Sequence, residues 1–393
     1  MDKVRIGVIG IGNMGAGHAS DLFGGSNENA CLTAVCDNRQ SRLDWAAEKF
    51  GDAVARFSDY KEMYDSGLID AVIIATPHYL HPPMAIEAFK KGIHVLSEKP
   101  IGVYTKAVKE MYAAAAEAAK NCVAFAIDYN QRTNPYYQKM REIVRSGELG
   151  DLKRCVWIIT DWYRTQSYYD SGTWRATWAG EGGGVLMNQA PHNLDLWQWI
   201  TGMPCAVTGE CDFGKYHNIE VEDDVTIYAK YPNGGTAVFI TTTGECPGTN
   251  RLEISGTKGK IVLEGSSLKW TKLSVDERDY CFHSEDGFKK CEWTTEEIKF
   301  PNGGTQHNGL RQNFINHILN GEELLAPGVE GINGLSICNA ALLSAWKGGK
   351  EVALPLDDEE YWAELQKHIA TSKSKENIVE KTASLEGTYG VSQ

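Results

Sequence analysis

The order of apolar and polar residues changes along the chain, and the first part alternates between two periodicities. Through residue 128, short apolar runs of strand length alternate with amphipathic stretches of helical length. The predicted strands are residues 4–10, 31–37, 70–76, 94–100 and 122–129, and the predicted helices are residues 39–50, 82–92 and 106–121. Strands that alternate with helices of this length indicate right-handed βαβ units and a parallel sheet. Residues 1–128 are therefore predicted to form an α/β domain.

The second part of the chain, residues 129–356, has a different pattern of residues. Most segments of residues 151–300 are rich in Thr, Val, Ile and Tyr and are broken by turns such as "YPNGGT" and "GTKGK". Helices are expected after Pro135 and Pro191, and helical patterns return at residues 307–349. We predict an α+β domain with a large open, mostly antiparallel sheet, whose last helices are free to pack back on the first domain. Residues 357–393 are predicted to be a C-terminal helix and a polar tail.

Composition narrows the class of protein. Hydrophobic residues make up 42% of the 393 positions and charged residues 23%, as in a soluble globular protein. The net charge of −13, without basic clusters, argues against nucleic acid and anionic membrane surfaces as partners. No apolar run approaches the roughly 18 residues of a membrane helix. The ten cysteines include no C-x-x-C pair, which predicts reduced thiols and a cytoplasmic location.

The stretch "GVIGIGNMG" contains Gly10-x-Gly12-x-x-Gly15 directly after a predicted strand and before a helical segment. Gly10 permits a tight turn, Gly12 lets the backbone approach a pyrophosphate, and Gly15 lets helix and strand pack closely. The N–H groups at the start of the helix would face the phosphates. This context predicts a dinucleotide-binding loop of the Rossmann type, in a doubly wound sheet. Its predicted cofactor-binding residues are Gly10, Ile11, Gly12, Asn13, Met14 and Gly15.

Asp37, at the end of the second predicted strand, indicates which of two cofactors is bound. A carboxylate there accepts hydrogen bonds from the ribose hydroxyls of NAD and repels the 2′-phosphate of NADP. Arg39 and Arg42 are close enough in sequence to soften that repulsion. We predict NAD rather than NADP, with Asp37, Asn38 and Arg42 at the cofactor.

Two further strands end in residues that suit a ligand site. One ends at Thr76-Pro77 and the next at Glu98-Lys99-Pro100, both at the carboxyl edge of the predicted sheet. Ligands bind at this edge in doubly wound folds. A residue before proline is easily held in an unusual backbone geometry, including a cis peptide. The plain alternative is that Lys99 is a solvated surface lysine.

Together these motifs resemble the Gfo/Idh/MocA family of glucose–fructose oxidoreductase and inositol dehydrogenase-like enzymes. The resemblance covers most of residues 3–356. It rests on the glycine loop, Thr76-Pro77 with His81, Glu98-Lys99-Pro100, "GELGD", the glycine run at 182–184 before His192, and "EGINGLSICNAALLSAWKGGKEVALP".

This resemblance implies NAD(P)-dependent oxidation of CH–OH groups in sugars and cyclitols, and homo-oligomers, dimers or tetramers, built through the C-terminal sheet. It also implies that Lys99 lies near the nicotinamide and the reacting hydroxyl, and that Thr76, Pro77, His81 and Glu98 belong to the cofactor site.

The stretch "VLMNQAPHNLD" carries the second chemical group. The resemblance places an aspartate four residues before an active-site histidine; here His192 matches the histidine and Asn188 replaces the aspartate. Imidazole titrates near neutrality and suits removal of a hydroxyl proton, while Lys99 would stabilise the alkoxide. The asparagine side chain does not take up or release a proton, so Asn188 is predicted to hydrogen-bond substrate or lysine instead.

The local pattern also predicts how His192 is held. Pro191 as first helical residue puts His192 in the first turn, where the helix dipole disfavours imidazolium. Asp195, three residues on, is predicted to orient the ring. Two alternatives stay open: a core histidine, or a metal ligand. The metal alternative has only His192 and Asp195 and no evident third ligand, so we predict no metal.

Between Trp157 and Trp178 the chain carries a series of Trp and Tyr residues with Arg164 and Arg175 among them. Aromatic faces suit the C–H faces of sugar rings and arginine suits hydroxyls, although core or oligomer packing would also explain the rings. The predicted substrate-binding residues are Lys99, Arg132, Tyr163, Trp174, Arg175, Asn188, His192 and His307.

These features predict a dehydrogenase of a neutral sugar, a glycoside, with oxidation at C3 as one possibility, or a cyclitol. Two alternatives remain: a redox-neutral NAD-dependent glycosidase of the same family, and a non-catalytic NAD-binding subunit or sensor. Net formation of NADH distinguishes a dehydrogenase from the redox-neutral glycosidase. A non-catalytic subunit or sensor would be expected to lack Lys99 or His192.

Overall fold

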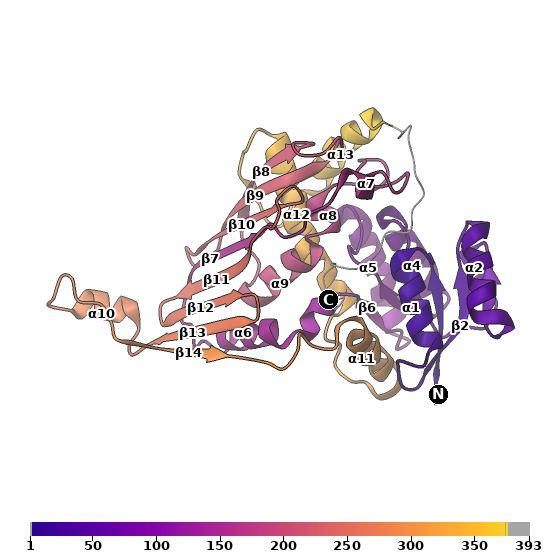
Figure 1. Cartoon of the computed structure of the whole chain (residues 1–393), viewed down its shortest axis with the longest axis horizontal. Helices are drawn as coiled ribbons and strands as arrows, with labels where there is room; N and C mark the ends of the chain where they lie inside the picture. The colour runs from indigo at the N-terminus through magenta and orange to yellow at the C-terminus, as the bar shows by residue number, and fades with distance from the viewer. Residues whose placement is uncertain (1, 374, 376–393) are drawn as a thin grey trace.

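The computed structural model describes residues 2–373 and residue 375, so most of the predicted polar tail lies outside the described part. Two β-sheets, each with its own helices, lie beside one another (Figure 1). In the described residues, no helix is long and apolar enough to cross a membrane.

The first sheet is the predicted Rossmann sheet. Its six strands are parallel in the order β3-β2-β1-β4-β5-β6, so the strand order reverses between β1 and β4. The strands are β1 (Val4–Ile9), β2 (Ala30–Cys36), β3 (Ala55–Phe57), β4 (Ala71–Ile74), β5 (His94–Ser97) and β6 (Phe125–Ile127). The helices are α1 (Asn13–Phe23), α2 (Gln40–Phe50), α3 (Tyr60–Asp65), α4 (His81–Lys90) and α5 (Thr105–Ala119). All four residues of β4 are buried, which explains its unbroken apolar run.

The second sheet has nine strands in the order β14-β13-β12-β11-β7-β10-β9-β8-β15. Only the β7–β10 pair is parallel among the pairs described, so the predicted open, mostly antiparallel sheet is confirmed. The strands are β7 (Leu152–Ile159), β8 (Ala206–Phe213), β9 (Glu222–Lys230), β10 (Thr236–Thr242), β11 (Asn250–Gly256), β12 (Gly259–Glu264), β13 (Ser267–Leu273), β14 (Trp293–Ile298) and β15 (Val352–Ala353).

Helices cover one face of this sheet. They include α6 (Pro135–Arg145), α9 (Pro191–Thr201) and α12 (Gly331–Trp346). Trp197 of α9 stacks on Phe239 of β10 with ring centroids 5.6 Å apart. Burial alternates along β9, where Ile227 is buried and Tyr228 is 41% exposed, so the described residues leave the opposite face of the sheet uncovered at this strand.

The remaining helices are α7 (Gln166–Tyr169), α8 (Val185–Asn188), α10 (Glu277–His283), α11 (Gln306–Asn320) and α13 (Asp358–Thr371). Of these, α11 returns to the Rossmann domain, where Arg311 donates hydrogen bonds to Asp21 (2.6 Å) and His18 (2.8 Å) of α1. In α12, Asn339 donates to the carbonyl of Val103 at 3.0 Å. These contacts fix the two domains around the carboxyl edge of the first sheet.

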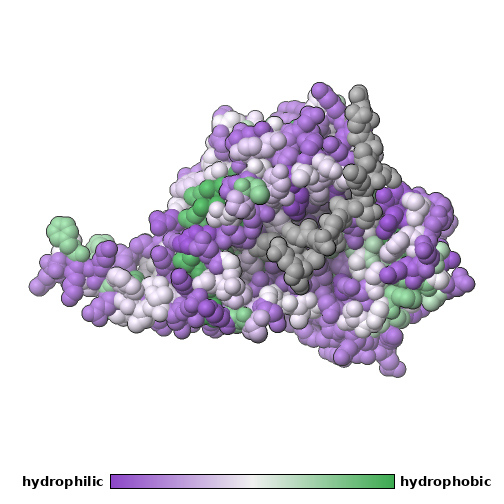
Figure 2. Space-filling view, viewed as in Figure 1, coloured by the Kyte–Doolittle hydropathy of each residue, from purple (hydrophilic) through white to green (hydrophobic). Residues whose placement is uncertain are grey.

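An arm of residues 274–292, which contains α10, projects from the edge of the second sheet between β13 and β14 (Figure 1). Its apolar side chains are unusually open, with Phe282 81% and Phe288 98% exposed. Figure 2 shows apolar surface at the end of this arm.

Candidate active site

The glycine loop has the shape that a dinucleotide needs. Gly10 has φ +80°, and a Cβ there would lie 2.6 Å from the carbonyl oxygen of Ala75. A Cβ on Gly15 would lie 1.9 Å from the carbonyl oxygen of Gly10, so the first turn of α1 packs directly on the loop. A Cβ on Gly12 would instead meet nothing among the described residues closer than Arg39, at 4.0 Å. The open side of the loop is therefore at Gly12, beside an N-terminus of α1 that has no side-chain cap, and the residues present fit a pyrophosphate.

Asp37 lies against this loop, directly after β2. Its Oδ2 accepts a hydrogen bond from the backbone N–H of Ile11 at 3.0 Å, and its Oδ1 accepts from the N–H of Arg39 at 3.0 Å. The Nε atom of Arg42 donates to the carbonyl of Ile11 at 2.6 Å, and Asn38 is exposed at the turn. The carboxylate is thus fixed beside the glycine loop, where it suits the ribose of NAD.

Lys99 extends from the end of β5 to the second domain. The Lys99–Pro100 peptide bond is cis, as its position suggested. The Nζ atom of Lys99 donates to the backbone carbonyl of Asn188, at the end of α8, at 2.8 Å. Burial lowers the pKa of Lys99, while the charges of Glu98 and Glu181 act in the opposite direction. Lys99 is therefore a held, partly buried ammonium and not a solvated surface lysine.

His192 lies in the first turn of α9, and Pro191 is the first residue of that helix, as predicted. The side chain is buried, and its Nδ1 atom has no hydrogen-bond partner among the described residues. Burial, followed by the positive charges of Lys99 and His307, lowers the pKa of His192 well below its usual value. The ring is therefore neutral near pH 7, and one nitrogen of a neutral imidazole can accept a proton.

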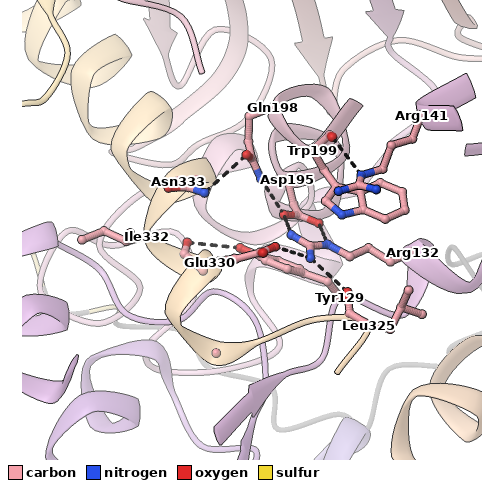
Figure 3. A network of polar contacts seen from close by, with 12 residues as sticks. Tyr129, Arg132, Arg141, Asp195, Gln198, Trp199, Leu325, Glu330, Ile332 and Asn333 are labelled. Atoms are coloured by element: carbon pink, nitrogen blue, oxygen red, sulfur yellow. Dashed lines mark hydrogen bonds and ion pairs between the residues drawn. The ribbon is translucent and has the colours of Figure 1, made fainter. Parts of the chain in front are cut away.

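Two predicted roles beside His192 are wrong. Asp195 does not orient the histidine and Arg132 does not face a substrate, because the two are paired with each other (Figure 3). Arg132 donates from Nε to Asp195 Oδ2 at 2.8 Å and from Nη2 to Oδ1 at 2.6 Å, and its Nη1 donates to Leu325 and Glu330. A fully buried guanidinium needs this pairing, so Arg132 fastens α9 in place, and four of its five N–H groups donate to these partners.

His307 belongs to a largely buried polar cluster that includes Glu98, the residue before Lys99. Its Nδ1 lies 3.0 Å from Asp128 Oδ2, and His18 Nε2 lies 2.8 Å from Glu98 Oε1. His18, Glu98, Asp128 and His307 are close enough together to hold a metal ion. Arg311, however, donates to His18 Nδ1, so the His18 proton is on Nε2 and points at the carboxylates. A hydrogen-bond network accounts for this cluster, and the absence of a metal stays a prediction.

His81 and Glu98 hold the loops and do not present their polar atoms to a cofactor. The ring nitrogens of His81 lie 2.7 Å from the carbonyl oxygens of both Thr76 and Pro100, so the predicted contact of His81 with the cofactor is corrected to a positioning role. The Glu98 carboxylate contacts His18 and the backbone N–H of the next residue. These bonds fix the ends of β4 and β5, and Lys99 extends from the end of β5.

Two aromatic residues of the predicted series, Tyr168 and Trp174, form a stack around Arg175. The guanidinium of Arg175 lies 4.6 Å from the ring centres of both Tyr168 and Trp174, and its Nη1 donates to the Tyr168 hydroxyl at 3.0 Å. Trp174 meets His78 of the Rossmann domain edge to face at 5.3 Å. Tyr163 is 47% exposed, and its role stays a prediction.

Two residues of this site, Glu181 and His78, were missed, and Tyr168 was included in the aromatic series without a function at the site. Glu181 is buried and binds the side chain of Asn188, Tyr168 contacts Asn188 and Arg175, and His78 binds the carbonyl of Glu181. The only signal in the sequence was that Glu181 directly precedes the glycines at 182–184.

Comparisons with known proteins identify the family. Residues 4–125 match the oxidoreductase family with an NAD-binding Rossmann fold, and residues 137–262 match the GFO/IDH/MocA C-terminal domain. Myo-inositol 2-dehydrogenase of Thermotoga maritima is 27% identical over 284 residues, which are 70% of this chain and 80% of that protein. The NAD(+)-dependent scyllo-inositol 2-dehydrogenase of Bacillus subtilis is 27% identical over 66% of this chain and 74% of its own length.

A solved structure has a similar fold. The WlbA dehydrogenase of Bordetella pertussis, in complex with NADH and UDP-GlcNAcA, has a TM-score of 0.74 at 28% identity and covers 90% of this chain and 100% of its own. The chain belongs to the Gfo/Idh/MocA family of oxidoreductases, with an N-terminal Rossmann domain that binds NAD.

Proposed function

We propose that this oxidoreductase is an NAD-dependent dehydrogenase that oxidises a secondary ring hydroxyl of a neutral sugar, glycoside or cyclitol. The observation that carries the proposal is the 2.8 Å contact between Lys99 Nζ and the Asn188 carbonyl, which brings the lysine of one domain to the segment that leads into His192 of the other. Relatives named as inositol dehydrogenases support the substrate class.

In this proposal the two side chains divide the proton chemistry. His192 is neutral, so a ring nitrogen that carries no proton accepts the hydroxyl proton. Lys99 donates to the oxygen and stabilises the negative charge that develops there. NAD, when bound, would accept the hydride from the carbon that bears this hydroxyl. Asn188 cannot relay a proton, and its carbonyl holds Lys99 instead.

The substrate would lie against the stack around Arg175. Trp174 offers an apolar face, and the hydroxyls would meet Arg175, Asn188 and His307. The WlbA complex holds a nucleotide-linked sugar acid, so carbohydrates of several kinds are accommodated by this fold. Oxidation at C3 of a glycoside belongs to this proposal as one member of the class.

A screen of NAD reduction against inositols, free sugars and glycosides tests the proposal. A dehydrogenase accumulates NADH with at least one of them. A redox-neutral glycosidase would cleave a glycoside without net NADH, and a non-catalytic subunit would bind NAD and turn over none of them.

We further propose that the chain forms a homo-oligomer, a dimer or tetramer, through the uncovered face of the nine-stranded sheet. Tyr228 on that face and the arm residues Phe282 and Phe288 are exposed to an extent that favours a partner surface. Light scattering coupled to size exclusion would show a mass that is a multiple of the 43.4 kDa chain; a monomer would contradict this.

All ten cysteines are free thiols, which supports the proposed cytoplasmic location.

A further inference from the structure

Glu181 is a buried carboxylate at the point where the two domains meet. The residue is 1% exposed, yet both oxygens have partners. Oε1 accepts from the side-chain amide of Asn188, and Oε2 accepts from the backbone N–H of Ala176 at 2.6 Å. Arg175 Nη1 lies 3.9 Å from Oε1. Burial raises the pKa of Glu181, while the charge of Arg175 and the hydrogen bonds from Ala176 and Asn188 act in the opposite direction and favour the carboxylate.

The contacts of Glu181 lead directly to Lys99. The side chain of Asn188 binds Glu181, and the backbone carbonyl of the same Asn188 accepts from Lys99 Nζ at 2.8 Å. On its other side, the carbonyl of Glu181 accepts from His78 Nδ1 at 3.2 Å, and His78 belongs to the Rossmann domain. Glu181 therefore fixes the position of the residue that holds the lysine.

Charge points to the same function. Asn188 itself carries none, and burial favours the neutral amine of Lys99. The charged and titratable groups around the ammonium are the acids Glu98 and Glu181, the cations Arg164 and Arg175, and the histidines His78, His81 and His192. The carboxylate of Glu181 is thus one of the two acids that counter several positive neighbours.

We propose that Glu181 is a positioning residue for Lys99: its carboxylate fixes Asn188 so that the carbonyl of Asn188 holds Nζ, and its negative charge keeps the lysine an ammonium. This inference rests on the proposed dehydrogenase function for its kinetic consequences, but not for its electrostatic ones. The charge and the hydrogen bonds can be separated by substitution.

Glu181→Gln removes the charge and one hydrogen bond, because the single oxygen of glutamine accepts from Ala176 or from Asn188 but not from both. The double variant Glu181→Gln with Asn188→Asp reverses donor and acceptor. In that variant the oxygen of the introduced glutamine accepts from Ala176, and its amide donates to the introduced carboxylate at position 188. The second substitution thus returns a negative charge beside Lys99.

Glu222→Gln is the matched control. Glu222 is also fully buried and binds the backbone N–H groups of Gly184 and Leu186, so it supports the same segment without touching Asn188. A purely structural function for Glu181 would make Glu181→Gln and Glu222→Gln behave alike.

The first measurement needs no substrate. The NAD-loaded protein is acetylated with a limiting amount of acetic anhydride across a range of pH, and the labelling of Lys99 is quantified by mass spectrometry. We expect the midpoint of Lys99 labelling to move to lower pH in Glu181→Gln, to return toward wild type in the double variant, and to be unchanged in Glu222→Gln. An unchanged or higher midpoint in Glu181→Gln, with no effect of the added aspartate, overturns the proposal.

The second measurement uses a substrate that reduces NAD. Glu181→Gln should lower kcat by about tenfold, a part of what a charge-stabilising group contributes, and should move the alkaline limb of the kcat profile to lower pH. The double variant should recover part of both. If none of the tested substrates supports NAD reduction by wild type, the proposed function fails. The labelling result still decides the role of Glu181.

Discussion

Replacing Gly12 by alanine changes the cofactor site and leaves the core intact. The added Cβ meets nothing among the described residues closer than 4.0 Å, so no side chain has to move. The φ of Gly12 is −70°, a value that alanine adopts readily, so the substitution does not force a left-handed backbone. We therefore expect the free energy of unfolding to change by less than about 1 kcal/mol.

The same methyl group occupies the open side of the loop, where the phosphates approach. Excluding one charge-assisted hydrogen bond of about 1.5–3 kcal/mol weakens NAD binding by roughly 10- to 100-fold. Titration calorimetry with NAD measures this loss, and thermal unfolding of the same sample checks the fold.

Gly15→Ala is the paired variant, and it is expected to affect stability where Gly12→Ala affects NAD binding. Its Cβ would lie 1.9 Å from the Gly10 carbonyl, whereas real Cβ atoms essentially never come closer than 3.0 Å, so α1 has to move away from the loop. We expect a loss of about 2–4 kcal/mol of stability, as in an overpacked core. If Gly12→Ala binds NAD as wild type does, or unfolds as easily as Gly15→Ala, the assignment of the loop is refuted.

Three further predictions concern single carboxylates. Asp37→Asn should weaken NAD binding by about tenfold and raise the relative affinity for NADP, because the repulsion of the 2′-phosphate is lost and Arg39, now 3.3 Å from that carboxylate, is released; paired NAD and NADP titrations measure it. Asp195→Asn should lower stability by about 3 kcal/mol in denaturant unfolding, because it leaves the buried Arg132 with only part of its charge pairing; a loss below about 1 kcal/mol would contradict the pairing. Burial raises the pKa of Glu222 from 4.5 to about 7, so ionisation is disfavoured in the folded state, and wild type should lose stability as pH rises from about 4.5 to about 7. Glu222→Gln removes this dependence, so the difference in unfolding free energy between the two proteins should change by on the order of 3 kcal/mol over that range, and a constant difference would speak against the shift.

The local motifs could be predicted from the sequence because their geometry is set within a few residues. The glycine loop, the cis Lys99–Pro100 bond and the helix start at Pro191 each follow from backbone rules that act over one turn. The alternation of apolar runs likewise predicted both sheets, since burial on one face or two determines the pattern.

Side-chain partners between distant segments could not be predicted in the same way. Asp195 is three residues from His192 and lies near it on the helix, yet it pairs with Arg132, 63 positions away, because a buried guanidinium requires two carboxylate oxygens. His81 was placed at the cofactor by motif, but its two nitrogens serve backbone carbonyls. Glu181 was missed because its importance arises only when the fold brings it to Asn188.

The central claim is that Lys99 and His192 act on one carbinol oxygen, and a double-mutant cycle on NAD reduction tests it most directly. With NAD binding verified for each variant, Lys99→Met and His192→Ala should each lower kcat/KM by about 10²- to 10⁴-fold. The double variant should lose far less than the product of the two single losses, because groups that act on the same atom are not additive. Single variants that keep wild-type rates, or losses that multiply, would contradict the account.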